Sequence, residues 1–371
     1  MQPLIGVLVL ASWLLAEVLI GSAPQKGEER FVPHPPDLTV TVWTEGLQVP
    51  WSLLFLPSGE ALVSERSGAI RRIDATGKLL DDPLITLNVH HAGEGGLMGL
   101  ALHPHYPEKP WLYAMHTYQD GSQLGNRVVR LIFEGGQARL DRVILSAIPG
   151  GRFHNGGRIA FGPDGYLYIT TGEIFDRAIA QDPKSLGGKI LRVDENGATP
   201  LDNPFKNAIY SLGHRNPQGL AWHPESGALF SSEHGPSGEV GFGAFDEINA
   251  IIKGGNYGWP LAVGAVKDKR FVDPIMTWPD RSVPPAGMAF WRGHLYVATL
   301  RSQTLLRLSI DDDQRVSSID RLFATDEHAG IYGRLRDVTV GPDGALYLLT
   351  SNRDGRGQPQ EGDDRILRIS K

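Results

Sequence analysis

The apolar residues of this chain fall in short alternating runs typical of β-strands, and one combination of turn and run occurs six times. Each copy has an apolar residue, a turn that usually contains proline and glycine, and a strand-like run, as in Phe161-Gly-Pro-Asp-Gly-Tyr-Leu-Tyr-Ile-Thr. The copies start at residues 55, 102, 161, 222, 290 and 340, at intervals of 47 to 68 residues. Glycine tolerates the positive φ of a tight turn, so each copy predicts a β-hairpin.

Repeats of this length predict a radial or solenoidal array. Six blades around a channel use all six copies and leave no long unpaired sheet edge, so we expect an all-β, six-bladed β-propeller of four-stranded antiparallel sheets. The copies fill residues 26–371, which we expect to form a single domain. This architecture requires residues 38–43 to pair with residues 365–369, although no sequence signal indicates that pairing.

The N-terminal segment differs from the rest of the chain. Residues 3–16 are almost entirely apolar, too few to span a bilayer comfortably, and a polar stretch follows them. Residues 1–25 are therefore predicted to be a secretory signal peptide of a periplasmic or secreted protein, with an uncleaved N-terminal anchor as the alternative. Because the chain has no cysteine, disulfides and thiol catalysis are excluded.

Charge narrows the range of partners. The chain has 36 basic and 42 acidic residues, a net charge of −6, and no basic run with interleaved aromatic residues. Nucleic acid is therefore not expected as a partner. The common hydrolase, nucleotide-binding and zinc-site motifs are also missing.

Two segments just ahead of repeat copies carry candidate catalytic residues. His154 lies in residues 152–158, and histidine is the side chain best suited to take a proton near neutral pH. Arg215 lies in residues 213–219 and offers a planar, permanently charged fork for a carboxylate or a developing oxyanion. A loop-ordering histidine and an inter-blade salt bridge are the alternatives.

Other segments beside the repeats combine acids, arginines and turns. Carboxylates and loop carbonyls occur together in three segments, residues 233–236, 246–249 and 256–260. Such hard oxygen groups are the ligands that Ca²⁺ requires, although turn formation alone also accounts for these segments. Arg334 and Arg336 lie two residues apart, so they share one face of an extended segment. This face is either a cationic binding site or a solvent-exposed edge. Equivalent positions in successive blades predict that these groups converge on one mouth of the channel.

These motifs resemble the soluble aldose sugar dehydrogenases that depend on pyrroloquinoline quinone (PQQ), in the glucose/sorbosone dehydrogenase family. The resemblance runs from about residue 49 to residue 366 and agrees with a six-bladed propeller. Its most specific stretches are residues 95–101 (GGLMGLA), 154–158 (HNGGR), 213–219 (GHRNPQG), 233–236 (EHGP), 246–249 (DEIN) and 256–260 (NYGWP).

The resemblance implies the catalytic roles. His154 matches the base that removes the proton of the sugar C1 hydroxyl while hydride passes from C1 to C5 of the quinone. Glu173 stands where the family usually has aspartate and would orient that base. Arg215 and Asn216 match the pair beside the reactive quinone oxygens.

The resemblance also implies the groups that hold the cofactor and metal. Arg334 and Arg336 match paired cations facing PQQ carboxylates, while Glu94 and Arg301 stand where relatives have glutamine and lysine. The carbonyls of Gly235 and Pro236 match ligands of the calcium that polarises PQQ. Glu247 and Tyr257 match residues associated with a second calcium.

The resulting hypothesis is an oxidoreductase that converts aldoses to lactones and passes electrons to an external acceptor. We expect a monomer or homodimer whose mature chain has no stable membrane span. A calcium-dependent lactonase-like hydrolase and a non-enzymatic interaction propeller are the alternatives, since propellers host many functions. Four cations at one mouth, Arg215, Arg301, Arg334 and Arg336, favour the dehydrogenase because PQQ carries three carboxylates.

Overall fold

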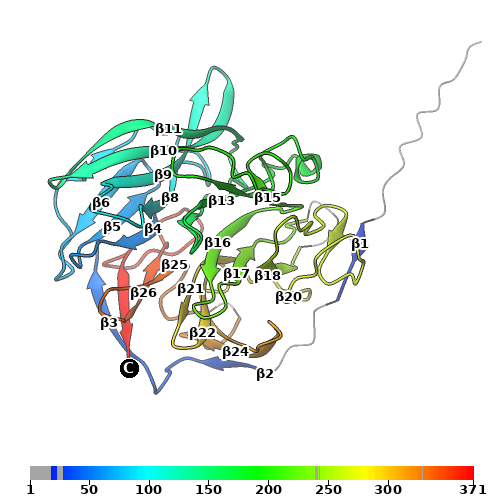
Figure 1. Cartoon of the computed structure of the whole chain (residues 1–371). Coiled ribbons are helices and arrows are strands. Elements are labelled where there is room, and N and C mark those ends of the chain that lie inside the picture. Colours follow the sequence, from blue (N-terminus) through cyan, green and yellow to red (C-terminus); the bar gives the residue numbers. More distant parts are fainter. Residues whose placement is uncertain (1–17, 23–27, 239–240, 242, 328) are drawn as a thin grey trace, which may run out of the picture.

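Six small sheets form the blades of a β-propeller around a common axis (Figure 1). The computed structural model describes residues 18–22, 28–238, 241, 243–327 and 329–371. Apart from the short 3-10 helix η1 (Arg177–Ala180), its regular elements are strands. The predicted fold class is therefore confirmed.

The blades follow the chain in order. Blade 1 contains β4 (Pro50–Phe55), β5 (Ala61–Glu65), β6 (Ala69–Ile73) and β7 (Ile85–Thr86); blade 2 contains β8 (Leu97–Leu102), β9 (Trp111–Asp120), β10 (Gln123–Glu134) and β11 (Gln137–Pro149); blade 3 contains β12 (Ile159–Phe161), β13 (Leu167–Thr171), β14 (Lys189–Val193) and β15 (Ile209–Leu212). Blade 4 contains β16 (Pro217–Trp222), β17 (Leu229–Glu233), β18 (Asp246–Ile251) and β20 (Met276–Trp278); blade 5 contains β21 (Pro285–Trp291), β22 (His294–Thr299), β23 (Leu305–Ile310) and β24 (Val316–Leu322); blade 6 contains β25 (Leu335–Val340), β26 (Leu346–Thr350), β27 (Ile366–Ser370) and β3 (Thr39–Thr44).

Each repeated segment forms the hairpin between the first and second strands of a blade. In blade 3, Phe161 pairs with Leu167, and Gly165 has a φ of 78° in the turn between them. In blade 6, Val340 pairs with Leu346 across a turn with Gly344 at a φ of 73°. The first strands of the blades surround the axis in Figure 1. The hairpin repeat predicted from the sequence is confirmed.

The ring closes between the two ends of the domain. In blade 6, β3 pairs antiparallel with β27, so that Thr41 lies opposite Arg368. The pairing expected of residues 38–43 and 365–369 is thus observed. The strand β2 (Glu28–Val32) was not predicted, and it adds to the outer edge of blade 5, parallel to β24.

Apolar side chains fill the spaces between neighbouring blades. Tyr113 of blade 2 and Ile169 of blade 3 belong to one buried cluster, and Tyr296 of blade 5 and Leu348 of blade 6 belong to another. Each such side chain contributes roughly 1.5–3 kcal/mol by leaving water. Blades are therefore buried on both faces, which holds their first strands at fixed positions around the axis.

A buried polar cluster ties four first-strand segments together near the axis. Arg158, just before β12, forms a 2.9 Å ion pair with Asp337 of β25. Its guanidinium also donates to the Gln218 carbonyl at 3.1 Å and to the Ser52 hydroxyl at 3.2 Å. Blades 1, 3, 4 and 6 are thereby joined at their centre, which fixes the loops at the ends of these strands.

Part of the predicted leader packs on the domain. The strand β1 (Leu19–Ile20) pairs parallel with β19 (Ala262–Val263), and the Gly21 amide donates to the Val263 carbonyl at 2.8 Å. Residues 1–17 and 23–27 lie outside the described residues, so leader cleavage and the boundary at residue 26 remain predictions. Within the described residues, no helix has the length and apolar character needed to cross a membrane.

Candidate active site

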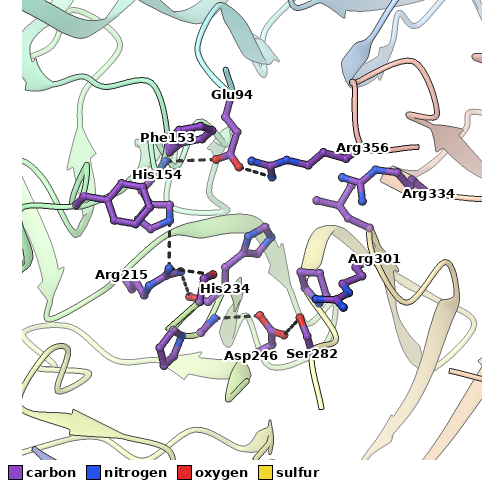
Figure 2. Close-up of a pocket in the computed structure, with 16 residues that line it drawn as sticks. Glu94, Phe153, His154, Arg215, His234, Asp246, Ser282, Arg301, Arg334 and Arg356 are labelled. Carbon is purple, nitrogen blue, oxygen red and sulfur yellow. Dashed lines mark hydrogen bonds and ion pairs between the residues drawn. The ribbon is translucent and has the colours of Figure 1, made fainter. Parts of the chain in front are cut away.

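One end of the propeller holds a cavity of about 460 Å³. Apart from Asp246, the first residue of β18, every lining residue comes from a segment just before a first strand or just after a second strand. Antiparallel pairing places those two ends at the same mouth. Figure 2 draws the lining residues as sticks and labels ten of them. The lining residues are Glu94, Phe153, His154, Phe175, Arg215, His234, Gly235, Pro236, Ser237, Asp246, Ser282, Pro284, Leu300, Arg301, Arg334 and Arg356.

His154 is held between a carboxylate and a guanidinium. Its Nδ1 lies 2.5 Å from Glu173 Oε1. Arg215 Nη2 lies 3.1 Å from the other ring nitrogen, Nε2 (Figure 2). An ionised carboxylate only accepts and a guanidinium only donates, so Nδ1 carries the hydrogen and Nε2 presents its lone pair. Glu173 is fully buried, and its Oε2 has no hydrogen-bond partner among the described residues. The pair therefore fixes which nitrogen of His154 can take a proton.

Close backbone packing brings Glu173 to His154. The residue before Glu173 is Gly172, where a Cβ would lie only 2.0 Å from the His154 carbonyl oxygen. The Glu173 amide donates to the Arg215 carbonyl at 2.9 Å, which links the segments carrying all three side chains. A side chain at position 172 would separate the base from its carboxylate.

An aromatic pair covers His154 at the mouth. The Phe175 ring centroid lies 3.9 Å from that of His154 and 6.0 Å from that of Phe153. Phe175 remains 51% exposed, and its φ of 66° is unusual for a residue with a bulky side chain. The backbone thus holds an apolar ring beside the histidine, where it shields the site from water on that side.

The predicted arginines lie at different depths. Arg301 and Arg334 line the cavity with Arg215, and Arg334 forms a 2.7 Å ion pair with Asp354. Arg301 makes no hydrogen bond or ion pair with the described residues. Arg336 lies outside this cavity, in an adjoining smaller pocket, and donates to Gln218 Oε1 at 2.7 Å. Burial lowers the pKa of Arg336 to about 9.

Asn216 and Glu94 also lie at this end of the propeller. Asn216 accepts the Gly156 amide through Oδ1 at 3.0 Å, and its Nδ2 is buried without a hydrogen-bond partner among the described residues. Glu94 lines both the cavity and the smaller pocket, and its Oε1 forms a 2.7 Å ion pair with Arg356. Glu94 is therefore next to a cation, although the sequence predicted it only as an acid among cofactor-binding groups.

The predicted metal-binding groups fall into two neighbouring places. Gly235 and Pro236 line the large cavity, and Asp246 holds this loop by accepting the Gly235 amide at 3.0 Å. Glu247 lies opposite Glu233 across the β17–β18 pair, beside a smaller cavity. Burial, together with the charge of Glu233, raises the pKa of Glu247 above its usual value. Two carboxylates facing each other in this way favour a cation between them.

Tyr257 can contribute to a metal site only through its backbone. Its hydroxyl donates to the Ala250 carbonyl at 2.7 Å and accepts the Ile252 amide at 2.9 Å. Its ring stacks on His214 at a centroid distance of 4.6 Å. The described residues contain no group of three or more His, Cys, Asp or Glu side chains arranged for a metal. A cation here would therefore depend on carbonyl oxygens together with Glu247.

Sequence reasoning missed His234, Phe175 and Arg356. His234 lines the cavity, and burial lowers its pKa to about 3, so its ring is neutral at pH 7. Phe175 and Arg356 follow the second strands of blades 3 and 6. Site residues were predicted mainly just before the first strand of each blade. All three residues could have been found by also considering the residues just after the second strands.

The sequence model of the family described as Glucose / Sorbosone dehydrogenase matches residues 47–367. Aldose sugar dehydrogenase YliI of Escherichia coli is 35% identical over 356 residues, which cover 86% of this chain and 92% of that protein.

Two solved structures are also similar over most of the chain. A Thermus thermophilus protein provisionally assigned as an oxidoreductase (glucose dehydrogenase) is 52% identical, with a TM-score of 0.84 over 90% of this chain and 100% of that one. The PQQ-bound aldose sugar dehydrogenase of Streptomyces coelicolor is 41% identical, with a TM-score of 0.80 over 91% of this chain and 99% of that one. The chain belongs to the glucose/sorbosone dehydrogenase family.

Proposed function

We propose that this protein oxidises aldose sugars at C1 to lactones, using PQQ and Ca²⁺, and that an external acceptor receives the electrons. The family assignment makes it an oxidoreductase that acts on CH–OH groups of sugars. The observation that supports the proposal most is one cavity that combines the His154–Glu173 pair with Arg215, Arg301 and Arg334.

The residues present fit a tricarboxylate cofactor. The cavity of about 460 Å³ has guanidinium groups on several sides, and guanidinium is the side chain that best recognises carboxylates. Arg301 and Arg334 would hold carboxylates of PQQ, and Arg336 would add its charge from the adjoining smaller pocket. The guanidinium of Arg215 would face its quinone oxygens, whereas Asn216, the next residue in the chain, is buried outside the cavity lining. When bound, PQQ would supply the acceptor for a hydride, which side chains lack.

His154 would take the C1 hydroxyl proton at Nε2. In this structure Nε2 accepts from Arg215 at 3.1 Å, so the sugar hydroxyl must replace that N–H before proton transfer. Glu173 keeps the hydrogen on Nδ1 and offsets the positive charge that the ring gains. Phe175 limits water at the ring, which keeps Nε2 available to the sugar.

Calcium fits the oxygen-rich side of the site. The carbonyls of Gly235 and Pro236 and the carboxylate of Glu247 are hard oxygen donors. A cation near Glu247 would relieve the repulsion from Glu233 that helps to raise its pKa. Tyr257 would add only its carbonyl, because its hydroxyl is already used. A bound Ca²⁺ would stabilise negative charge developing in the cavity.

Reconstitution tests the proposal. We expect purified apoprotein to reduce a redox dye with glucose only when both PQQ and Ca²⁺ are added, with the lactone as product. Omitting either component is the control. Lactone hydrolysis in the absence of PQQ would favour the lactonase-like alternative, and no turnover of any aldose by PQQ-loaded protein would favour an interaction propeller.

Location and assembly are part of the same proposal. A leader at residues 1–25 would direct the protein to the periplasm or outside the cell, where it would act as a monomer or homodimer. N-terminal sequencing of the exported protein tests leader removal. Light scattering of the purified protein measures its oligomeric state.

A further inference from the structure

Glu94 places a carboxylate in a cavity that we propose for a tricarboxylate. Its side chain is 19% exposed, and its Oε2 accepts the His154 backbone amide at 3.3 Å. It lines the cavity beside the candidate base, so it lies within the proposed cofactor site (Figure 2). An uncompensated negative charge at this position would oppose binding of a trianion, and more strongly here than in water because the surroundings are less polar.

Arg356 reaches the same carboxylate from blade 6, which is separated from blade 2 by blade 1. It follows β26 in blade 6, whereas Glu94 precedes β8 in blade 2, and the two groups form a 2.7 Å ion pair. The Arg356 guanidinium lies 5.6 Å from the Phe153 ring centroid. Burial would raise the pKa of Glu94, but the charge of Arg356 and the hydrogen bond from its guanidinium hold that pKa below its usual value. Glu94 is therefore ionised, and Arg356 carries its counter-charge.

Two of the other arginines that line the cavity already have partners. Arg334 is already paired with Asp354 at 2.7 Å, and Arg215 donates to His154 Nε2. The positive charge available to an incoming anion is therefore smaller than the count of arginines indicates. Whether Glu94 is neutralised then has a large influence on the net charge of the cavity.

We propose that Arg356 is a cofactor-site residue whose ion pair with Glu94 cancels the charge of that carboxylate and so allows the cavity to bind a tricarboxylate anion. This inference rests on the proposed function. It assigns opposite effects to the two members of one ion pair, which a purely structural salt bridge does not.

The test is a titration of apoprotein with PQQ at fixed Ca²⁺, followed by protein fluorescence, so that no turnover is needed. Arg356→Gln is expected to weaken PQQ binding by about tenfold or more, because it leaves Glu94 uncompensated. Glu94→Gln is expected to tighten binding, because it frees Arg356 for the anion. The double variant is expected to return to within about threefold of the wild-type affinity, as two contacting residues are not additive.

Arg270→Gln is the matched control. It removes the same charge from a 2.7 Å ion pair with Asp268, in residues that do not line the cavity, and PQQ affinity should not change. Melting temperatures of all variants show whether they fold, and Arg356→Lys should retain most of the affinity if charge is what matters.

Three results would overturn the inference. One is a lower melting temperature of Arg356→Gln with unchanged PQQ affinity, as expected of a clasp between blades. Another is weaker binding by Glu94→Gln, because the carboxylate would then hold the cofactor site together. The third, a wild-type protein that binds no PQQ at all, would contradict the proposed function itself.

Discussion

Replacing Glu173 with glutamine should slow turnover while leaving PQQ binding nearly unchanged. Glu173 is fully buried, and its Oε1 lies 2.5 Å from His154 Nδ1. A hydrogen bond to a charged group is worth about 1.5–3 kcal/mol, and each 1.36 kcal/mol is tenfold in rate, so kcat should fall about 10- to 150-fold. The amide keeps the shape of the carboxylate but removes the charge that offsets the imidazolium. It can also donate to Nδ1 and so select the wrong tautomer.

Steady-state kinetics of PQQ-loaded protein, with cofactor occupancy measured by absorbance, provide the assay for Glu173→Gln. KM for glucose should change little, because Glu173 does not line the cavity. The double variant His154→Ala/Glu173→Gln should be no slower than His154→Ala alone, since Glu173 acts through His154. An unchanged kcat in Glu173→Gln, or a multiplicative loss in the double variant, would refute this reasoning.

Four further predictions follow from the same structure. His154→Ala should reduce kcat by about 10²- to 10⁴-fold with PQQ affinity retained, and near-wild-type turnover would exclude it as the base. Arg334→Ala/Arg336→Ala should mainly weaken PQQ binding in titrations, because cofactor carboxylates are present before and after the chemical step; unchanged affinity with a large loss of kcat would contradict this. EDTA should abolish activity and lower the melting temperature, with recovery by Ca²⁺ and not Zn²⁺; a demonstrably metal-free sample that keeps both would exclude calcium. Burial lowers the pKa of His116 from 6.5 to about 4, so between these pH values the unfolded chain binds more protons than the folded one, and stability falls as the pH drops from about 6.5 to 4. His116→Gln should flatten the dependence of melting temperature on pH in this range. An unchanged slope of melting temperature against pH would count against the prediction.

The fold was predictable because its information is local. Each copy of the repeat combines a turn that needs glycine at positive φ with alternating apolar residues, and the resulting hairpin is the unit of a blade. Six copies then imply ring closure, and the observed pairing of β3 with β27 follows from that count. The strand β2 belongs to no repeat, so nothing in the pattern indicated that it would extend blade 5.

The position of the candidate site could be predicted, but which side chains line the cavity itself could not. Residues ahead of the repeats reach one mouth because each first strand begins there. Arg334 and Arg336, two residues apart, were expected to act together, yet one lines the cavity and the other the pocket beside it. The pairing of β25 with β26 shifts register between Leu335 and Asp337, and such a bulge re-aims neighbouring side chains.

The Glu94–Arg356 pair was beyond prediction for a related reason. The two residues are 262 positions apart, and they meet only because blades 2 and 6 present loops at the same mouth. Their order along the chain does not specify which arginine reaches the carboxylate. Contacts between loops of different blades depend on side-chain directions in several loops at once, and these directions are set by the packed structure.

The most direct test of the central claim is a single-turnover experiment with glucose deuterated at C1. Protein loaded with PQQ and Ca²⁺ is mixed with labelled or unlabelled sugar in the absence of an electron acceptor, and the absorbance of the cofactor is followed. We predict that glucose reduces the bound cofactor once, yields the lactone, and shows a primary isotope effect on that rate because the C1 hydrogen is transferred. Cofactor reduction that is independent of glucose, or equal rates with the two sugars when reduction itself is rate-limiting, would contradict oxidation at C1 in this cavity.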